Sequence, residues 1–281
     1  MSESSDSNRM TPAVQVLRRL IVSPLFKLTV ILYMLTAVYN IVLIIQDKSF
    51  FYQYIAMLQR TMEEMLVLPS GILIHVTQGI YAMGPVVVVL IFVPEVLRFL
   101  GMMMLGISVD KLQGPTRETG GLSILQAAFI LEGVFYTLID LLITGIIFLG
   151  MLGEIKTGQM NGGSAILYTI LFLAAAAAAV LIIAYTVNMS RTIRSIRATM
   201  RDGEVRNGVS LYVILINLIM SVILAVASLQ TFHFTEVGGM LVSGVGIAIL
   251  LLITLGLAWY RKQMQILAAE KVQIKRKKEN E

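Results

Sequence analysis

Six long apolar stretches, separated by shorter polar ones, make up most of this chain. An α-helix needs about 20 apolar residues to cross the roughly 30 Å of hydrocarbon in a bilayer. The stretches of that length cover residues 25–45, 84–105, 122–150, 165–187, 211–229 and 238–260. The pattern predicts an all-α fold, a polytopic integral membrane bundle of six transmembrane helices that forms one domain over residues 25–260. The third stretch is long enough to tilt or to project past the bilayer.

Polar and amphipathic segments lie at both ends of this domain. Residues 1–24 are polar and then place apolar side chains at helical spacing, with Arg18 and Arg19 suited to lipid headgroups. They predict a cytoplasmic N-terminus with an amphipathic helix that leads into the first span. Residues 261–281 predict a basic cytoplasmic tail, a solvated continuation of the last helix.

The longest connection, residues 46–83, also has an amphipathic part. Apolar side chains recur at helical intervals between residues 51 and 66, which predicts a helix on the outer membrane surface. The following residues, 72–83, fit either the connection or an early start of the second span. The exact start of that span therefore stays open.

Basic residues alternate between the connections and give the orientation. Nineteen of the 22 Lys and Arg residues fall in the N-terminal region, in residues 98–117, in residues 191–206 and in the tail. The other three, Lys48, Arg60 and Lys156, fall in the alternate connections. Since cytoplasmic loops retain Lys and Arg, both termini are predicted to lie inside.

Composition agrees with a membrane protein and excludes some chemistry. The chain is 57% hydrophobic and 14% charged, whereas a soluble domain carries about a quarter charged residues. It has no cysteine, which excludes disulfides, thiolate metal sites and a cysteine nucleophile. Residues 1–24 lack an apolar core followed by a small-residue cleavage site, so the first span is expected to act as an uncleaved signal.

Catalytic motifs are not found. His75 and His233 both fall on the predicted outer side, and neither has a His, Cys or carboxylate nearby at ligand spacing. Asp140 is the single aspartate in a predicted span, whereas an intramembrane aspartyl protease needs two. No P-loop or Gly-rich dinucleotide motif occurs. We therefore expect no enzyme activity, no cofactor and no metal.

Charged residues inside the spans are candidates for a functional site. Each costs about 2.5–3.5 kcal/mol at a helix centre, so such residues usually face the bundle interior and pair. Glu95 and Arg98 lie three residues apart on one helix, and the depth of Glu132 in the next span places it within reach of Arg98. We predict an intramembrane polar cluster of Glu95, Arg98, Glu132 and Tyr136, with Asp140 further out and able to snorkel outward or to line a vestibule. The cluster either fixes helix register or lines an ion, proton or substrate pathway.

A second candidate lies in the basic segment "SRTIRSIRATMRDG". If the fourth span continues as a helix, Arg191, Arg194, Arg197 and Arg201 form one basic stripe, apart from the apolar side chains. This stripe suits anionic lipid headgroups on the cytoplasmic side, or a cytoplasmic or membrane protein partner. Nucleic acid is a poor candidate, because positive-inside topology already requires these charges.

Two similar stretches, "TRETGGLSIL" and "EVRNGVSLYV", precede the third and fifth spans. They are either the trace of a duplicated helical hairpin or ordinary capping chemistry at a helix start.

These features favour a binding, scaffold or accessory subunit without catalysis of its own. The alternative is a transporter or permease subunit, with or without a separate ATPase, that uses the Glu/Arg cluster. A stand-alone carrier is disfavoured because few polar residues line the spans and no span has a central Gly/Pro break.

The stretches "SPLFKLTVILYMLTAVYNIV", "TGGLSIL" and "RTIRSIRATMRDGEVRNGVSLYV" resemble an uncharacterised family of multi-pass membrane proteins from Gram-positive gut bacteria of the Firmicutes type. The resemblance covers about half of the chain and implies a bacterial cytoplasmic membrane. It implies no activity and no functional residue.

Overall fold

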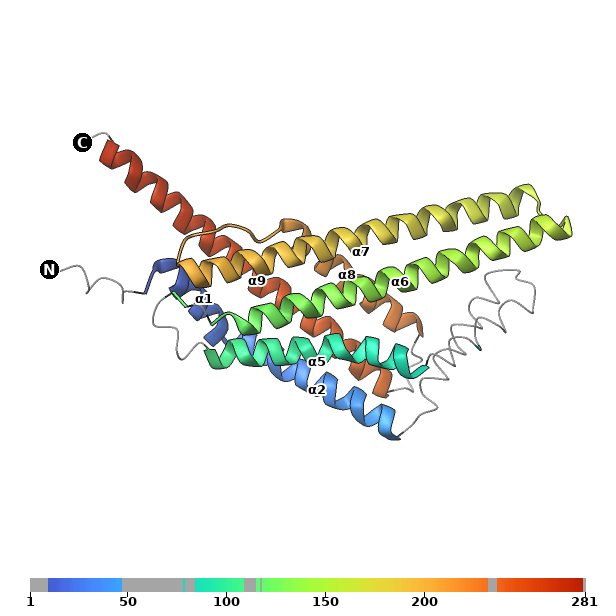
Figure 1. The fold of residues 1–281 in the computed structure, drawn as a ribbon, viewed down its shortest axis with the longest axis horizontal. Helices are drawn as coiled ribbons and strands as arrows, with labels where there is room; N and C mark the ends of the chain where they lie inside the picture. Colours follow the sequence, from blue (N-terminus) through green and yellow to red (C-terminus); the bar gives the residue numbers. More distant parts are fainter. Residues whose placement is uncertain are drawn as a thin grey trace. The chain divides into compact units, whose positions relative to one another are not determined.

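The described part of the chain consists mainly of α-helices. The computed structural model describes residues 10–46, 78, 84–108, 115–116, 118–231 and 237–279. Its helices are α1 (Pro12–Val22), α2 (Pro24–Gln46), α5 (Gly84–Ser108), α6 (Gly120–Thr157), α7 (Gly162–Asp202), α8 (Leu211–Thr231) and α9 (Val237–Glu279) (Figure 1). No strand occurs in these ranges, so the all-α prediction is confirmed for them.

Each predicted apolar stretch lies in a helix that begins close to the expected residue. Among the described residues, three helices are long and apolar enough to cross a membrane, namely Gly120–Thr157, Gly162–Asp202 and Gly244–Ile274. A fourth is added if α1 and the start of α2, which meet at a bend of 49°, count as one span. These helices indicate a membrane-embedded protein. The predicted outer helix at 51–66 and the stretch 72–83 lie outside the described residues, apart from residue 78.

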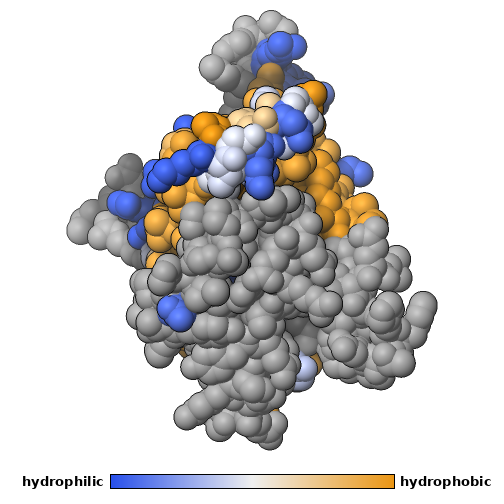
Figure 2. Space-filling view, turned by 90° about the vertical axis from the view of Figure 1, so that its right-hand side faces the viewer, coloured by the Kyte–Doolittle hydropathy of each residue, from blue (hydrophilic) through white to orange (hydrophobic). Residues whose placement is uncertain are grey.

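The apolar part of α7 exposes its side chains rather than burying them. Of the 18 residues that form its most apolar stretch, only 6% are buried, and Leu173 and Val180 are each 66% exposed. Figure 2 shows hydrophilic residues at the connection between α6 and α7, and hydrophobic surface behind it. Such a surface fits a lipid environment, because water would strongly disfavour it.

The helices belong to two compact units. The first unit comprises Met1–Ala37, Glu95–Phe129 and Val187–Glu281, and the second comprises Val38–Pro94 and Ile130–Thr186. In the first unit α9 packs against both α1 and α8. The buried face of α1 includes Val14 and Leu17, whereas Arg18 and Arg19 are exposed, so α1 has one apolar and one basic face.

Two glycines bring α5 and α6 into backbone contact within the first unit. A Cβ atom added to Gly121 would lie 2.6 Å from the carbonyl oxygen of Gly101 and 2.7 Å from the backbone nitrogen of Leu105. No larger residue fits between the two helices here. Small residues allow the same close approach in other membrane helix pairs.

A non-helical stretch, residues 203–210, follows α7 and is termed the return segment. Figure 1 shows it running back along α7 before α8 begins. Ser210 ends it, and its backbone N–H donates to Thr192 Oγ1 over 3.3 Å while its Oγ donates to Asn188 Oδ1 over 3.1 Å. α8 therefore starts beside residues that lie about three to four turns before the end of α7.

Two further contacts hold the middle of the return segment. Gly208 packs directly on the side chain of Ser195, with no room for a Cβ atom. Arg261 of α9 donates from NH1 to the carbonyl oxygen of Val209 over 3.0 Å. In the similar stretch before the third span, Gly121 lies inside α6 and packs on α5. The two matching stretches thus occupy different structural positions, and each glycine has its own packing requirement.

The second unit has a small core in the hairpin of α6 and α7. Ile146 and Ile147 of α6 are buried against Tyr168 of α7. Tyr168 donates its hydroxyl to Oε1 of the buried Glu154 over 3.2 Å. Elsewhere in the hairpin, Gly133 packs on Thr186 with no room for a Cβ atom.

Candidate functional site

The last turns of α7 separate apolar and basic side chains onto two faces. The helix runs without a break from its apolar part to Asp202, as the arginine spacing predicts. One face is buried and carries Met189, Ile193, Ile196 and Met200. The other is exposed and carries Arg191, Arg194, Arg197 and Arg201. These four arginines are termed the arginine face.

Two hydrogen bonds hold the start of α6 against this part of α7. Gln126 Nε2 donates to Ser190 Oγ over 2.9 Å, and Arg197 Nε donates to Thr119 Oγ1 over 3.0 Å. Because seven residues separate the two partners on each helix, the bonds lie about two turns, or roughly 10 Å, apart along antiparallel helices. α6 therefore fixes the position of Arg197.

A glycine ends α7 and turns the chain back toward the arginine face. Gly203 has φ +69°, a conformation that favours glycine, and its N–H closes the last turn of the helix. A Cβ atom there would lie 2.9 Å from both Pro115 Cγ and Thr11 Oγ1. Beyond this turn Arg206 reaches back to Asp202, with 2.8 Å between NH2 and Oδ2.

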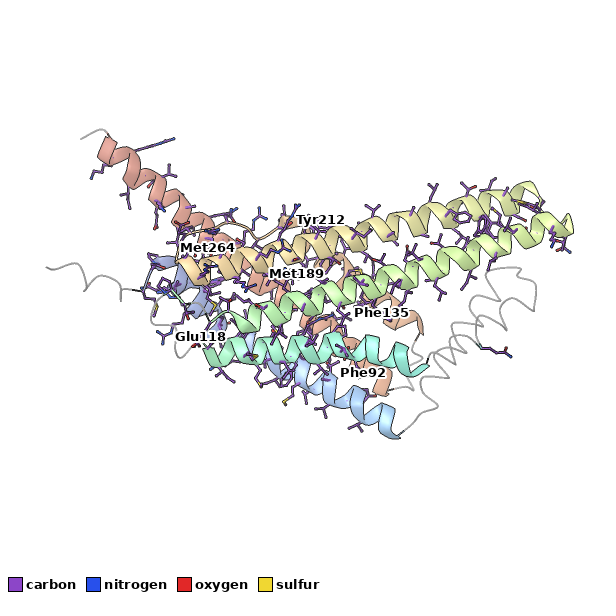
Figure 3. The ribbon with its side chains drawn as sticks, in the orientation of Figure 1. Phe92, Glu118, Phe135, Met189, Tyr212 and Met264 are labelled. Atoms are coloured by element: carbon purple, nitrogen blue, oxygen red, sulfur yellow. The ribbon has the colours of Figure 1, made fainter. Side chains whose placement is uncertain are left out.

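An open pocket of about 590 Å³ lies between these groups and is termed the arginine pocket. Its lining residues are Thr119, Arg194, Arg197, Ala198, Arg201, Asp202 and Arg206. Four guanidinium groups thus face a single carboxylate, so the pocket carries a clear excess of positive charge. Glu118, which lies beside Thr119 at the start of α6, is exposed and is not part of the lining (Figure 3).

The charges in the pocket are only partly paired. Asp202 contacts Arg206 and, at 3.9 Å, Arg201, and Glu204 lies 3.6 Å from Arg206. Across the residues that the structure describes, Arg194 and Arg197 have no carboxylate at ion-pair distance. Because exposed ion pairs stabilise proteins by only ~0–1 kcal/mol, an anionic ligand can displace those that exist. The arrangement can therefore bind an anion.

The sequence identifies only part of this pocket. Thr119 and Arg206 join it because the start of α6 and the return segment fold against α7. Arg191, although predicted with the stripe, does not line the pocket. The Asp202-Gly203 pair marks a helix end in the sequence, and with it the turn that brings Arg206 back.

The predicted intramembrane cluster is centred on Arg98 in α5. Its NH1 donates to the Tyr33 hydroxyl over 3.5 Å, and its guanidinium carbon lies 5.1 Å from the centre of the Phe129 ring and 5.8 Å from that of Tyr33. Guanidinium groups are attracted to aromatic faces at such distances. Both aromatic partners were missed from the sequence. Glu95 lies one turn before Arg98, and both side chains are half-buried.

The other predicted members belong to the second unit, and the contact between Arg98 and Glu132 stays a prediction. Tyr136 is 47% exposed and its ring lies 6.0 Å from that of Phe135. Asp140 is buried, with 9% exposure. Its role, either snorkelling outward or lining a vestibule, stays a prediction.

In the described ranges, no group of three or more His, Asp or Glu side chains could hold a metal ion. Comparisons with protein families, curated proteins and solved structures find no match to this chain.

Proposed function

We propose that the chain is a six-span protein of the bacterial cytoplasmic membrane, with both termini inside, that acts as a binding, scaffold or accessory subunit without catalysis of its own. The observation that carries this proposal is the arginine pocket at the end of α7. On the topology predicted from the basic residues, the pocket faces the cytoplasm. It would bind an anionic group there, either on a lipid headgroup or on a partner molecule.

Two of the arginines that line the pocket are positioned by contacts with other elements. Arg197 donates to Thr119, the residue before α6, and the return segment that carries Arg206 is bonded to α7 and α9. Side chains held in place before binding lose less conformational entropy when a ligand arrives. A stripe that only met lipid headgroups at the membrane surface would need no such support.

The topology can be tested with single-cysteine variants, because the natural chain has no cysteine. Ala198→Cys should react with a membrane-impermeant maleimide only after the cells are opened, and Lys156→Cys should react in intact cells. Labelling of both positions from the same side would refute the six-span arrangement.

The binding function can be tested by photocrosslinking in intact cells. A photoreactive amino acid at Ala198, in the pocket, should give a defined adduct that disappears when Arg194 and Arg197 are changed to Gln. The same probe at Ile166, an exposed position near the other end of α7, is the matched control. Equal adducts at the two positions, or an adduct that survives loss of both arginines, would contradict the proposal.

The second candidate function is a transporter or permease subunit, and Arg98 is the observation that favours it. A half-buried arginine in an apolar helix, held by two aromatic side chains, can meet an ion or substrate inside the membrane. If the cluster only fixes packing, Arg98→Met should destabilise the protein by about 1–3 kcal/mol. Glu95→Gln, Arg98→Met and Glu132→Gln together should then restore stability, by our prediction that the three groups pair.

Growth of a strain that depends on the protein separates the two functions. A stable but inactive triple variant would support the transporter, and a stable, active one would remove it. A triple variant no more stable than Arg98→Met would refute the predicted pairing.

A further inference from the structure

The arginine pocket presents its donors from three separate elements. Arg194 and Arg197 project from α7, Arg206 comes from the return segment, and Thr119 lies at the start of α6. Thr119 is 7% exposed, and its oxygen already accepts from Arg197 Nε, so its own hydroxyl proton is available to another acceptor. The donors therefore surround a volume rather than lie along a line.

We propose that this pocket is a binding site for a phosphate group carried on a larger molecule. The inference rests on the proposed binding function and narrows its ligand. A carboxylate has two oxygens in one plane and is satisfied by a single arginine fork. A phosphate monoester has three terminal oxygens that point in different directions, and it can use guanidinium groups from several sides together with a hydroxyl.

The size of the pocket agrees with a ligand larger than free phosphate. Its volume of about 590 Å³ falls within the roughly 300–1,000 Å³ of small-molecule sites. The pocket is open, so the group attached to the phosphate can extend out of it. Asp202 disfavours a second anionic group beside Arg206, so a ligand with one phosphate is preferred.

The phosphate can come from a lipid headgroup or from a soluble phosphate ester. Arg194 and Arg201 are seven residues apart on α7, or about 10 Å along the axis. On the predicted span, which ends at residue 187, Arg194 lies seven residues, or about 10 Å, beyond the hydrocarbon. The headgroup layer is roughly 5–7 Å thick on each side, so the pocket begins just beyond it. A long arginine side chain there reaches back to a lipid phosphate, and the open side of the pocket admits a soluble phosphate ester with the same chemistry.

The test uses the full-length protein in a neutral maltoside detergent and inorganic phosphate as the probe, followed by calorimetric titration. Phosphate should bind saturably at one site, and Arg197→Gln and Arg194→Gln should each weaken binding about tenfold or more, as expected when one charge-assisted contact is lost. Thr119→Val should weaken it, while Thr119→Ser should retain it. Arg276→Gln, which removes an equal charge from the exposed tail of α9, is the matched control and should change nothing.

Nanodiscs then distinguish the two sources. If the ligand is a lipid, nanodiscs that contain phosphatidic acid should abolish phosphate binding, whereas nanodiscs of phosphatidylcholine alone should not. If the ligand is soluble, phosphate should bind equally in both. Either result supports a phosphate site.

Absence of saturable phosphate binding, or equal affinities of the natural protein and Arg197→Gln, would overturn the inference. A poly-glutamate peptide that binds when phosphate does not would also overturn it, while leaving the proposed binding function in place. Loss of the photoadduct at Ala198 is the separate readout for that function.

Discussion

The contact between Gly101 and Gly121 gives a stability prediction that follows from distances alone. In Gly121→Ala the new Cβ would lie 2.6 Å from the Gly101 carbonyl oxygen, which is about 0.8 Å short of the 3.4 Å at which ordinary contact begins. The obstructing atoms belong to the backbone, so no side chain can rotate away. α5 and α6 must therefore separate by a similar distance over this crossing.

Overpacking of this kind costs about 1–3 kcal/mol, and the gain in helix propensity from Gly to Ala is at most ~1 kcal/mol. We expect Gly121→Ala to lower the free energy of unfolding by about 1–2 kcal/mol. Gly120→Ala is the matched control, since its Cβ would lie 3.5 Å from Met104 Cε, an ordinary contact. Its effect should stay within about 0.5 kcal/mol.

The assay is reversible unfolding by SDS in mixed micelles, followed by circular dichroism for the natural protein and both variants. Gly101→Ala creates the same separation from the other helix, so the double variant should cost less than the two single variants together. If Gly121→Ala is as stable as Gly120→Ala, the two backbones do not touch and the reasoning fails.

Three further changes test other parts of the structure by the same assay. Gln126→Leu should lower the free energy of unfolding by about 1 kcal/mol, because it removes the hydrogen bond to Ser190. A double-mutant cycle of these two residues should give a coupling energy of roughly 0.6–2 kcal/mol, and a coupling of zero would contradict the bond. Tyr168→Phe removes the hydroxyl that donates to Glu154 Oε1. It should lower the free energy of unfolding by ~1–3 kcal/mol, because a buried acceptor is left without its partner. An unchanged stability would mean that water reaches the carboxylate. Gly203→Ala should destabilise the protein more than Gly158→Ala. The two glycines have nearly the same φ, +69° and +68°, but of the two only Gly203 has atoms within 4 Å of an added Cβ. Equal effects would show that backbone conformation alone matters.

The helices themselves could be predicted from the sequence. Apolar residues in runs of about 20 leave few structural alternatives, since every backbone polar group must be satisfied within the segment. The separation of arginines from Ile193, Ile196 and Met200 also followed from spacing, because residues three and four apart share a helix face.

The arginine pocket could be predicted only in part. Spacing along α7 places Arg194 and Arg197 on one side, but says nothing about which other segment comes to face them. Arg206 arrives through an irregular stretch, where no periodicity constrains the path of the chain. Thr119 arrives through the packing of α6 on α7, a contact between segments about 70 residues apart that no local pattern predicts.

The surroundings of Arg98 show a different limit. The depth of a residue in its span predicts which charged residues can pair with Arg98. Tyr33 and Phe129, however, contact Arg98 through their rings. In a sequence rich in apolar residues, an aromatic side chain that contacts a cation cannot be told from one that only packs.

The return segment contacts three helices, α7, α8 and α9. Its eight residues, 203–210, begin at the end of α7, carry Arg206 and end at Ser210, where α8 starts. Arg261 of α9 donates a hydrogen bond to the same segment at Val209. A ligand that draws Arg206 toward itself would pull on this short segment. The displacement would reach the first turn of α8 through the peptide chain, and it would reach α9 through the guanidinium group of Arg261. The pocket is thus joined to α8 through the peptide chain itself and to α9 through one side-chain hydrogen bond.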